Sequence, residues 1–452
     1  MQPKISLLLF FCLLSSCKPN NEKLLSYQLD LNSLETNRYN DIRFDPTPIK
    51  VDGNSPKIKS QDIFKKNTRF TPLETNDESL FGKIDEFILT DSRYIIADRS
   101  TNSILVFFHD GKFDFKIDRS GGGPEEYRSI KYIGFNKFKN TIEVLDNTRG
   151  IIQRYDANTG IYQSTLKLGF LLKAFTPLDE NKYLFFLGPY LFNEDRYGQV
   201  NGLGHQLLVA EEVEDKRVKI ISQHLPHTPN TELLNLGARQ NLSEGSDGDF
   251  LINMVFNDTI YSFSEKGVHA KYVMDYGKWA IPENLFQNGD IREINRKNRL
   301  RQLPYPDIFL ETKDYTYSVS SLETANAFTH TLYNKKLKKG FTFGDIDDNM
   351  QVAGAIPYSP IGYQGNSLIY VMEPKNAVDK YLEFTTALRK ALIADNGKSR
   401  PEMSIDEQYE FYLNNYIQEN GFNYLDLAKS LDPDDNPVLV FVEPDFNNID
   451  DQ

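Results

Sequence analysis

A unit of four short strand-like segments recurs along this chain, and this repeat restricts the fold more than any other feature. The clearest unit covers 84–118, and a second covers 130–168. The two units keep a constant offset, since Asp98 aligns with Asp146, 48 residues later. Val, Ile, Tyr and Phe dominate the segments, and turn-forming Asn, Asp and Gly separate them. Each unit therefore predicts a meander of four antiparallel strands.

The spacing of the units predicts a β-propeller. Phe107 precedes Tyr155 by 48 residues and Phe263 by 156, which equals three units of about 52. A four-stranded sheet cannot bury both of its faces alone, so neighbouring units must stack around a common axis. Weaker units occupy the remaining positions, at 171–221, 310–341 and 351–372. The sequence thus predicts an all-β chain folded as a six-bladed β-propeller of four-stranded antiparallel blades.

A propeller must close, because its first and last blades otherwise expose their edges. A strong strand pattern at 436–442 and the segment 69–73 before the first unit are both expected to complete the sixth blade. The segment 377–431 has helical spacing and a capping box at 404–407, which predicts a helical insertion before the closing strand. This insertion is either a lid packed on the rim or a helix pair that binds a partner. A further helix with a solvated basic face is expected within 282–302.

The N-terminal residues have the pattern of a lipoprotein signal. Residues 5–14 form an apolar run that is too short to span a bilayer, which needs about 20 residues, and Ser15 and Ser16 precede Cys17. Cleavage there would make Cys17 a lipidated N-terminus held on the membrane by its acyl chains. The alternative is an ordinary secretory signal that leaves Cys17 as a plain thiol. The predicted organisation is a signal peptide over 1–16, a flexible tether over 17–46, the propeller over 47–446 and a tail over 447–452.

Cysteine content and charge exclude several classes of function. Both cysteines, Cys12 and Cys17, lie in or directly after the leader, so the mature domain has no thiol for disulfide, redox or zinc-thiolate chemistry. Removal of Lys4 leaves 50 basic against 64 acidic residues, a net charge of −14. No long basic block is present, which argues against nucleic acid and anionic lipid headgroups as ligands. A fold of this size needs no partner for stability, and we expect a monomer.

Four short motifs carry a resemblance to a known family. They lie at 71–75, 106–113, 121–127 and 435–440. Together they resemble Bacteroides-type lipoproteins with six-bladed β-propellers, which are similar in architecture to NHL-repeat proteins, over about residues 48–446. The motif at 121–127 departs from the usual form by Glu125, where a glycine is common. The resemblance implies a fold, a place in the cell envelope and an accessory role beside nutrient transporters, but no agreed activity. Lys18 follows Cys17 where an Asp would favour the inner membrane, so we expect an outer-membrane lipoprotein on either the periplasmic or the surface face.

Three motifs that suggest chemistry are incomplete. Gly121–Gly123 is followed by neither a Lys-Ser/Thr pair nor a helix, so it is interpreted as a blade-to-blade crossing and not as a phosphate loop. His224 and His227 lie three residues apart in a Pro-rich segment without a third ligand. No Gly-x-Ser-x-Gly elbow occurs. The sequence therefore predicts no cofactor, no metal site at these histidines and no defined catalytic residue.

Charged side chains in predicted loops mark a candidate binding site. Propeller ligands usually bind at the mouth of the central channel, between the loops that join the second and third strands and the crossings between blades. Eight charged residues map to such loops in the first two blades: Asp98, Arg99, Arg119, Glu125, Glu126, Arg128, Asp146 and Arg149. They could hold a polar ligand or a protein loop. Alternatively, Asp98 and Asp146 only cap their turns.

Two functions from different classes remain. The leading interpretation is a lipid-anchored binding or scaffold module of the cell envelope, with a protein partner such as an outer-membrane transporter, or an extracellular polymer, as ligand. The alternative is a metal-assisted hydrolase or lyase at the channel mouth, in which Asp98 and Asp146 hold a divalent ion. No catalytic constellation stands out, which favours binding without deciding against an enzyme.

Overall fold

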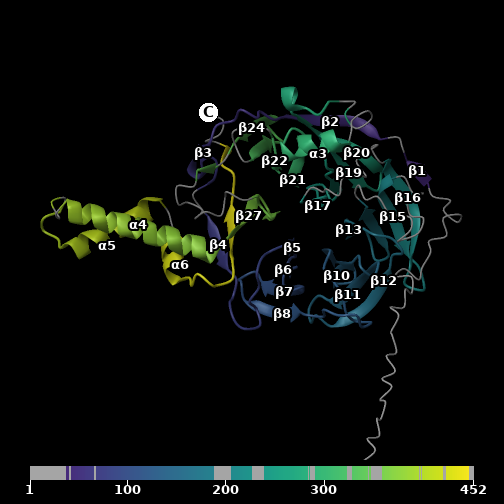
Figure 1. Ribbon diagram of the computed structural model, residues 1–452, viewed down its shortest axis with the longest axis horizontal. Coiled ribbons are helices and arrows are strands. Elements are labelled where there is room, and N and C mark those ends of the chain that lie inside the picture. Colours follow the sequence, from purple (N-terminus) through teal and green to yellow (C-terminus); the bar gives the residue numbers. More distant parts are fainter. Residues whose placement is uncertain are drawn as a thin grey trace, which may run out of the picture.

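Six antiparallel sheets surround a common axis in the computed structural model of the chain (Figure 1). The structure describes residues 37–39, 42–65, 68–187, 205–226, 239–282, 285, 291–322, 328–344, 346–347, 359–395, 398, 400–420 and 424–446. The signal peptide, Cys17, the first part of the tether and the tail after residue 446 lie outside these ranges. The predicted six-bladed β-propeller of four-stranded antiparallel blades is confirmed.

Five blades are built from consecutive strands. Blade 1 contains β5 (Glu86–Leu89), β6 (Arg93–Asp98), β7 (Ser103–Phe108) and β8 (Phe113–Ile117). Blade 2 contains β9 (Tyr132–Asn136), β10 (Thr141–Asp146), β11 (Ile151–Asp156) and β12 (Tyr162–Lys167). Blade 3 contains β13 (Ala174–Pro177), β14 (Lys182–Phe186), β15 (His205–Glu212) and β16 (Val218–Pro226). Blade 4 contains β17 (Leu242–Glu244), β18 (Phe250–Ile252), β19 (Thr259–Ser264) and β20 (Gly267–Asp275). Blade 5 contains β21 (Pro306–Glu311), β22 (Tyr315–Ser320), β23 (Thr329–Asn334) and β24 (Lys339–Phe343).

The central strands of each blade are buried on both faces because a neighbouring blade covers each face. In β6, Ile95 and Ala97 pack toward blade 2, whereas Tyr94 and Ile96 pack toward blade 6. Side chains alternate along a strand, so one apolar run supplies two separate cores. This arrangement explains why the second and third strands of the units have the strongest apolar pattern in the sequence.

The sixth blade joins distant parts of the chain. It contains β26 (Gly362–Gln364), β27 (Ser367–Met372), β28 (Val438–Val442) and β4 (Arg69–Pro72), in that order. Every residue of β28 is buried, and β4 pairs antiparallel with it, Val438 opposite Pro72. The expected closure by the N- and C-terminal segments is therefore present.

The N-terminal segment differs from the prediction, because part of the expected tether is ordered strand. β1 (Asn37–Tyr39) pairs parallel with β16, and β2 (Arg43–Lys50) pairs parallel with β20. β3 (Ile58–Lys59) then pairs parallel with β25 (Ile346–Asp347), which follows blade 5. We call residues 37–39 and 42–59 the strap; these residues lie along the outer rim of three consecutive blades (Figure 1). The strap supplies the backbone partners that the outer edges of blades 3 and 4 would otherwise lack.

The helical insertion lies between β27 and β28, as predicted. It contains α4 (Pro374–Ala394), α5 (Ile405–Asn420) and α6 (Tyr424–Ser430). The expected capping box is present, since Ser404 N donates to Glu407 Oε2 (2.7 Å) and Glu407 N donates to Ser404 Oγ (3.2 Å). Ala377 and Leu425 are buried against the core shared by blades 5 and 6, and the rest of α4 and α5 extends away from the ring (Figure 1). The insertion is thus an arm anchored at its base.

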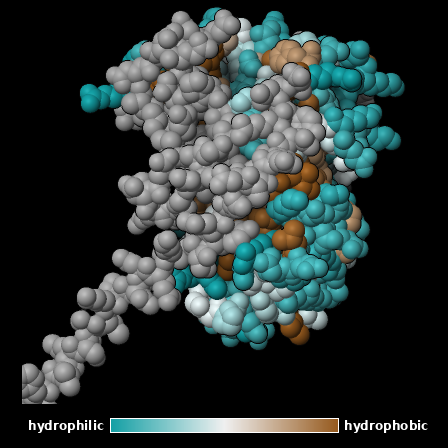
Figure 2. Space-filling model, turned by 90° about the vertical axis from the view of Figure 1, so that its right-hand side faces the viewer, coloured by the Kyte–Doolittle hydropathy of each residue, from teal (hydrophilic) through white to brown (hydrophobic). Residues whose placement is uncertain are grey.

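One other helix, α3 (Ile291–Arg299), falls within the predicted range 282–302, and its Ile294 packs on Phe256 and Leu303. Among the described helices, none combines the length and apolar character required to cross a bilayer. Seen from the side of blade 3, the described surface is mostly hydrophilic, with small hydrophobic patches (Figure 2).

The blades place their turns at two opposite ends of the propeller. The turns between first and second strands and between third and fourth strands lie at one end, which we call face A; blade 1 contributes 90–92 and 109–112. The turns between second and third strands and the crossings between blades lie at the other end, face B, to which blade 1 contributes 99–102 and 118–131. The charged residues predicted as a binding site belong to face B.

Candidate binding face of the propeller

A cavity of about 590 Å³ lies in the central channel toward face A. Residues from all six blades line it, most of them in first strands or the turns that follow. Its aromatic members are Phe87, Tyr132, Phe135, Phe175, Phe250 and Tyr363. The Tyr132 and Phe175 rings meet edge to face with centroids 5.6 Å apart, and the Tyr363 hydroxyl donates to the Glu244 carbonyl (3.2 Å). We call this space the channel cavity.

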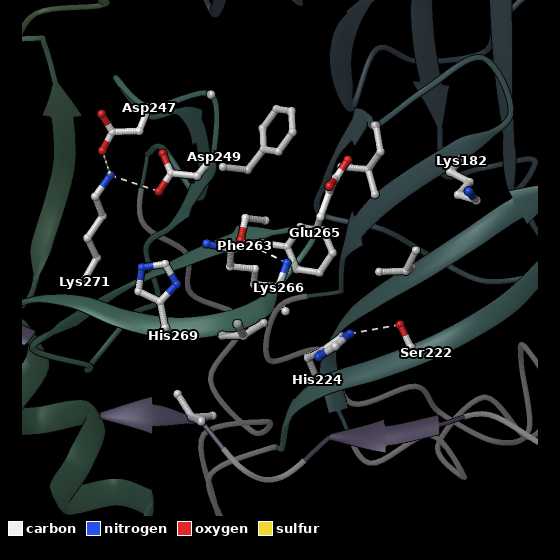
Figure 3. A pocket seen from close by; sticks show the side chains of 18 of the residues that line it. Lys182, Ser222, His224, Asp247, Asp249, Phe263, Glu265, Lys266, His269 and Lys271 are labelled. Carbon is white, nitrogen blue, oxygen red and sulfur yellow. Dashed lines mark hydrogen bonds and ion pairs between the residues drawn. The ribbon is translucent and has the colours of Figure 1, made fainter. Parts of the chain in front are cut away.

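A second cavity, of about 1090 Å³, lies between blades 3 and 4, and we call it the interblade groove. Its described lining includes Ile42 of the strap, face-A turns of both blades, and strand residues such as His224 of β16 and Phe263 of β19 (Figure 3). Asp247, Asp249 and Lys271 lie on one side of it, and Lys182 of blade 3 lies on the other (Figure 3). The groove therefore has charged side chains of both signs around its opening.

The charged groups on the blade 4 side are already engaged. Lys271 Nζ lies 2.9 Å from Asp249 Oδ2 and 2.7 Å from Glu311 Oε2 of blade 5. Burial alone would lower the pKa of Lys271, but its hydrogen bonds to Glu311 and Asp249 hold that pKa above its ordinary value. Lys271 thus joins blade 4 to blade 5 and is not a free cation of the groove.

On the blade 3 side, the groove contains a buried histidine. His224 Nε2 lies 2.9 Å from Ser222 Oγ, and its ring meets that of Phe263 of blade 4 edge to face at 5.6 Å. Burial, together with the nearby His205, lowers the pKa of His224 to about 4. The imidazole is therefore neutral at ordinary pH and acts here as a packed ring.

The neighbouring interface between blades 2 and 3 shows how such a space is closed elsewhere. Arg154 Nε lies 3.0 Å from Glu143 Oε1, and Arg154 Nη2 lies 2.8 Å from Glu212 Oε2 of blade 3. The Tyr183 hydroxyl donates to Glu143 Oε1 (2.8 Å). At the interface between blades 3 and 4, Val209 and Leu178 are among the groove-lining residues instead. The described residues of blade 3 thus contribute apolar side chains to the groove.

The two cavities meet at one residue. Phe250, the first residue of β18, lines both the channel cavity and the interblade groove. Both cavities lie toward face A, and Phe250 is part of the wall of each. This shared residue makes face A a single candidate binding face.

On face B, the carboxylates of Asp98 and Asp146 accept hydrogen bonds from nearby loop residues. Asp98 accepts hydrogen bonds from Gly82 N (2.8 Å), Ser100 N (2.8 Å) and Thr101 Oγ1 (2.9 Å). Burial alone would raise the pKa of Asp98, but the hydrogen bonds from Ser100, Gly82 and Thr101 hold that pKa below its ordinary value. Asp146 accepts from Arg128 N (2.8 Å) and Thr148 N (2.9 Å). These contacts match the alternative interpretation of the sequence, in which Asp98 and Asp146 cap their own turns.

The structure brings most of the other predicted residues to the interface between blades 1 and 2. Arg99 forms an ion pair with Glu86 and donates to the Lys131 carbonyl (2.8 Å). Arg149 donates to the carbonyls of Gly123 (3.0 Å) and Glu126 (2.6 Å). The Glu126 carboxylate accepts from Gly123 N (2.7 Å). The side chains of Arg119, Glu125 and Arg128 are exposed.

None of these eight residues is among the described residues that line the two cavities. A role for them in binding on face B stays a prediction. The region also contains a group that the sequence did not indicate: burial raises the pKa of Glu86 to about 7 despite the adjacent Arg99.

The motifs that suggested chemistry have structural roles in the described residues. Gly121–Gly123 lies in the crossing from blade 1 to blade 2, where the buried Tyr127 hydroxyl donates to the carbonyls of Asn102 and Ile117, both at 3.0 Å. His224 lies in β16 and not in a loop, whereas His227 lies outside the described residues. Within the described residues, no group of three or more His, Cys, Asp or Glu side chains is placed to hold a metal ion.

The channel-lining aromatics were missed by the sequence interpretation, although a signal for them exists. Phe87, Tyr132 and Phe175 recur 45 and 43 residues apart, close to the blade period, in the first strand of each unit. First strands are short and partly exposed, so their apolar pattern is weaker than that of the central strands. The aromatic spacing could have indicated a ring-lined channel.

Comparisons with solved structures agree with the fold. A protein described as exported, from Bacteroides fragilis NCTC 9343, aligns with a TM-score of 0.61 at 15% identity, over 89% of this chain and 100% of that one. A member of the DUF4221 family from Bacteroides vulgatus aligns at 0.44 and 9% identity, over 87% and 99%. Virginiamycin B lyase from Staphylococcus aureus aligns at 0.35 and 13% identity, over 67% and 81%. No curated protein matches the chain.

A family profile covers almost the whole folded part. The family described as a domain of unknown function, DUF4934, matches residues 46–443, which include the second half of β2, all six blades and the helical arm. This chain therefore belongs to the DUF4934 family.

Proposed function

We propose that this protein is a lipid-anchored binding module of the cell envelope that holds an extended ligand on face A. One observation carries the proposal: the channel cavity and the interblade groove open on the same face and share Phe250. Two adjacent cavities on one face suit a segment of a protein partner or of an extracellular polymer better than a compact metabolite.

The location is part of the same proposal. The pattern before Cys17 supports lipidation, and the likeness to an exported protein of Bacteroides fragilis supports a place in the envelope. An outer-membrane lipoprotein with such a face would serve as an accessory subunit of a nutrient transporter or as a capture site for polymer. The sequence alternative, metal-assisted catalysis at Asp98 and Asp146, is not favoured, because loop amides already occupy both carboxylates.

The test is to block face A and ask whether the ligand is lost. Ser243 lines the channel cavity, so Ser243→Trp would fill part of it; Thr148→Trp adds the same bulk to an exposed position on face B. Native cells that produce wild type or either variant would be crosslinked, and the purified lipidated protein analysed for bound protein and polymer. We expect Ser243→Trp to lose what wild type and Thr148→Trp retain. Equal retention by all three, or no bound protein or polymer on wild type, would contradict the proposal.

A further inference from the structure

The channel cavity has an unusual combination of aromatic and acidic side chains. Its six rings come from blades 1, 2, 3, 4 and 6, so they surround the axis instead of forming one flat patch. Ring faces carry partial negative charge, and several rings around one space attract a cation more than any single ring does. The cavity is large enough, at about 590 Å³, to hold a small organic group.

The fully charged side chains among its described lining residues are all acidic. Asp91 and Glu244 lie at its face-A end, both exposed, and no Lys or Arg is among the described lining residues. The rest of the described lining contains His109, apolar side chains such as Leu242 and polar uncharged groups such as Gln240. An anionic ligand would have to leave water and approach two carboxylates, whereas a cation is attracted by both the carboxylates and the rings.

Two arginines near the channel cavity, Arg69 and Arg93, contact other side chains. Arg69 lies 3.4 Å from the centroid of the Phe441 ring and donates to Gln364 Oε1 (2.6 Å). Arg93 Nε pairs with Asp114 Oδ2 at 2.6 Å. Asp114 therefore offsets the charge of Arg93, whereas Arg69 keeps its charge but directs its guanidinium to the Phe441 ring and to Gln364.

Tyr363, which lines the channel cavity, has a raised pKa. Burial, followed by the negative charges of Glu244, Glu311 and Asp249, raises the pKa of Tyr363 to about 12. Burial is the main cause of this shift and the carboxylates add to it, so the Tyr363 phenol is neutral at ordinary pH.

From these contacts, and building on the proposed function, we infer that the channel cavity binds an organic cation, an ammonium or guanidinium group on an apolar body. The rings would enclose the cation and its methylene groups, and Asp91 and Glu244 would face its charge at the entrance. The cation is either a free small molecule or the Lys or Arg side chain of a partner that lies along face A. Both sources present the same chemistry to the cavity.

Paired probes that differ in one charge test this inference. Choline and 3,3-dimethylbutan-1-ol have nearly the same shape, and only choline is charged. Their affinities for the full-length protein would be measured by calorimetry or NMR titration. We expect choline to bind at least tenfold more tightly. Equal affinity of the two probes or tighter binding of the alcohol would overturn the inference, and so would failure of both choline and the cationic amides described below to bind.

Substitutions of Asp91 and Glu244 test the role of the two carboxylates, and a second pair of acidic residues provides a control. Asp91→Asn with Glu244→Gln should weaken choline binding severalfold and leave the alcohol unchanged. Glu214→Gln with Asp215→Asn removes the same charge from an exposed turn of blade 3 and should leave both affinities unchanged. Weakening of choline binding by both pairs alike would show a long-range charge effect only and would overturn the inference.

A second set of three probes distinguishes the two possible sources of the cation. N-acetyl-lysine amide and N-acetyl-arginine amide are compared with N-acetyl-norleucine amide, which is uncharged. Tenfold preference for the cationic amides supports a partner side chain, and preference for choline alone supports a free cation. If neither class binds but Ser243→Trp still abolishes retention of the native ligand, the proposed function stands and the cation assignment fails.

Discussion

At the residue scale, close contacts decide which part of the channel is filled and which is open. Gly134 in β9 lies against the Phe175 ring, where a Cβ would be only 2.7 Å from Cε2 of that ring. Phe175 in turn lies between Tyr132 and Tyr183. Glycine at this position therefore permits two neighbouring first strands to approach, and the approach determines the width of the channel cavity.

Gly134→Ala should destabilise the protein by about 1–3 kcal/mol, because the added methyl group must displace a packed ring. The change in the free energy of unfolding would be measured by urea titration. Gly122→Ala is the control, since a Cβ there meets nothing within 4 Å, and its effect should stay within about 0.5 kcal/mol. Equal effects of the two substitutions would contradict the tight contact at Gly134.

His224 predicts a pH dependence of stability. Its folded pKa of about 4 lies below the ordinary value of about 6.5, so the unfolded chain binds a proton that the folded chain excludes. The stability due to neutral His224 is complete above pH 6.5 and is lost as pH falls from 6.5 to about 4, by up to about 3 kcal/mol. His224→Gln should flatten the plot of unfolding free energy against pH in this range. Parallel plots for the two proteins would show that His224 is not the group responsible.

At the element scale, the closing strand was predictable and the strap was not. β28 is apolar throughout because two blades cover it, so its sequence, Val-Leu-Val-Phe-Val, identifies it as a buried strand. In β2 only Ile49 is buried, and its pairing with β20 depends on backbone hydrogen bonds that almost any sequence can make. The strap therefore has no apolar period, and the sequence suggested a tether.

The strap should contribute measurably to stability through Ile49. Ile49 is 1% exposed in the core shared by blades 4 and 5, so Ile49→Ala should cost about 2–4 kcal/mol. The adjacent Lys50 has an exposed side chain, and Lys50→Ala should change stability by less than about 0.5 kcal/mol. Thermal or urea unfolding would measure both. If the strap only lay on the surface, Ile49→Ala and Lys50→Ala would have equally small effects on stability, which would contradict the prediction.

At the scale of the whole molecule, the repeat predicted the number of blades, their strand order and their closure. These properties follow from period and burial, which a single sequence records. Which end of the channel is open depends instead on how side chains from six blades fill the axis. Asp98 and Arg99 belong to the expected type of loop, yet the described cavities are at the opposite face, beside Phe250.

The proposed anchor gives a prediction for the complete chain. Cys17→Ala removes the acyl acceptor but changes no residue of the propeller, so the protein should leave the membrane and keep its fold. Carbonate washing of membranes followed by immunoblotting measures release, and circular dichroism measures the fold. Retention of the variant on washed membranes would show that another feature anchors the protein.

Site-specific photo-crosslinking in intact native cells tests the central claim, binding on face A, most directly. A photoreactive residue would replace Asp91 or Lys266 on face A, and Arg119 or Arg128 on face B, all of which have exposed side chains. Crosslinked products would be compared by electrophoresis and mass spectrometry. The account predicts ligand crosslinks from the two face-A positions and none from the two face-B positions. Crosslinks from Arg119 and Arg128 alone would instead place the binding site where the charged loops of the sequence suggested.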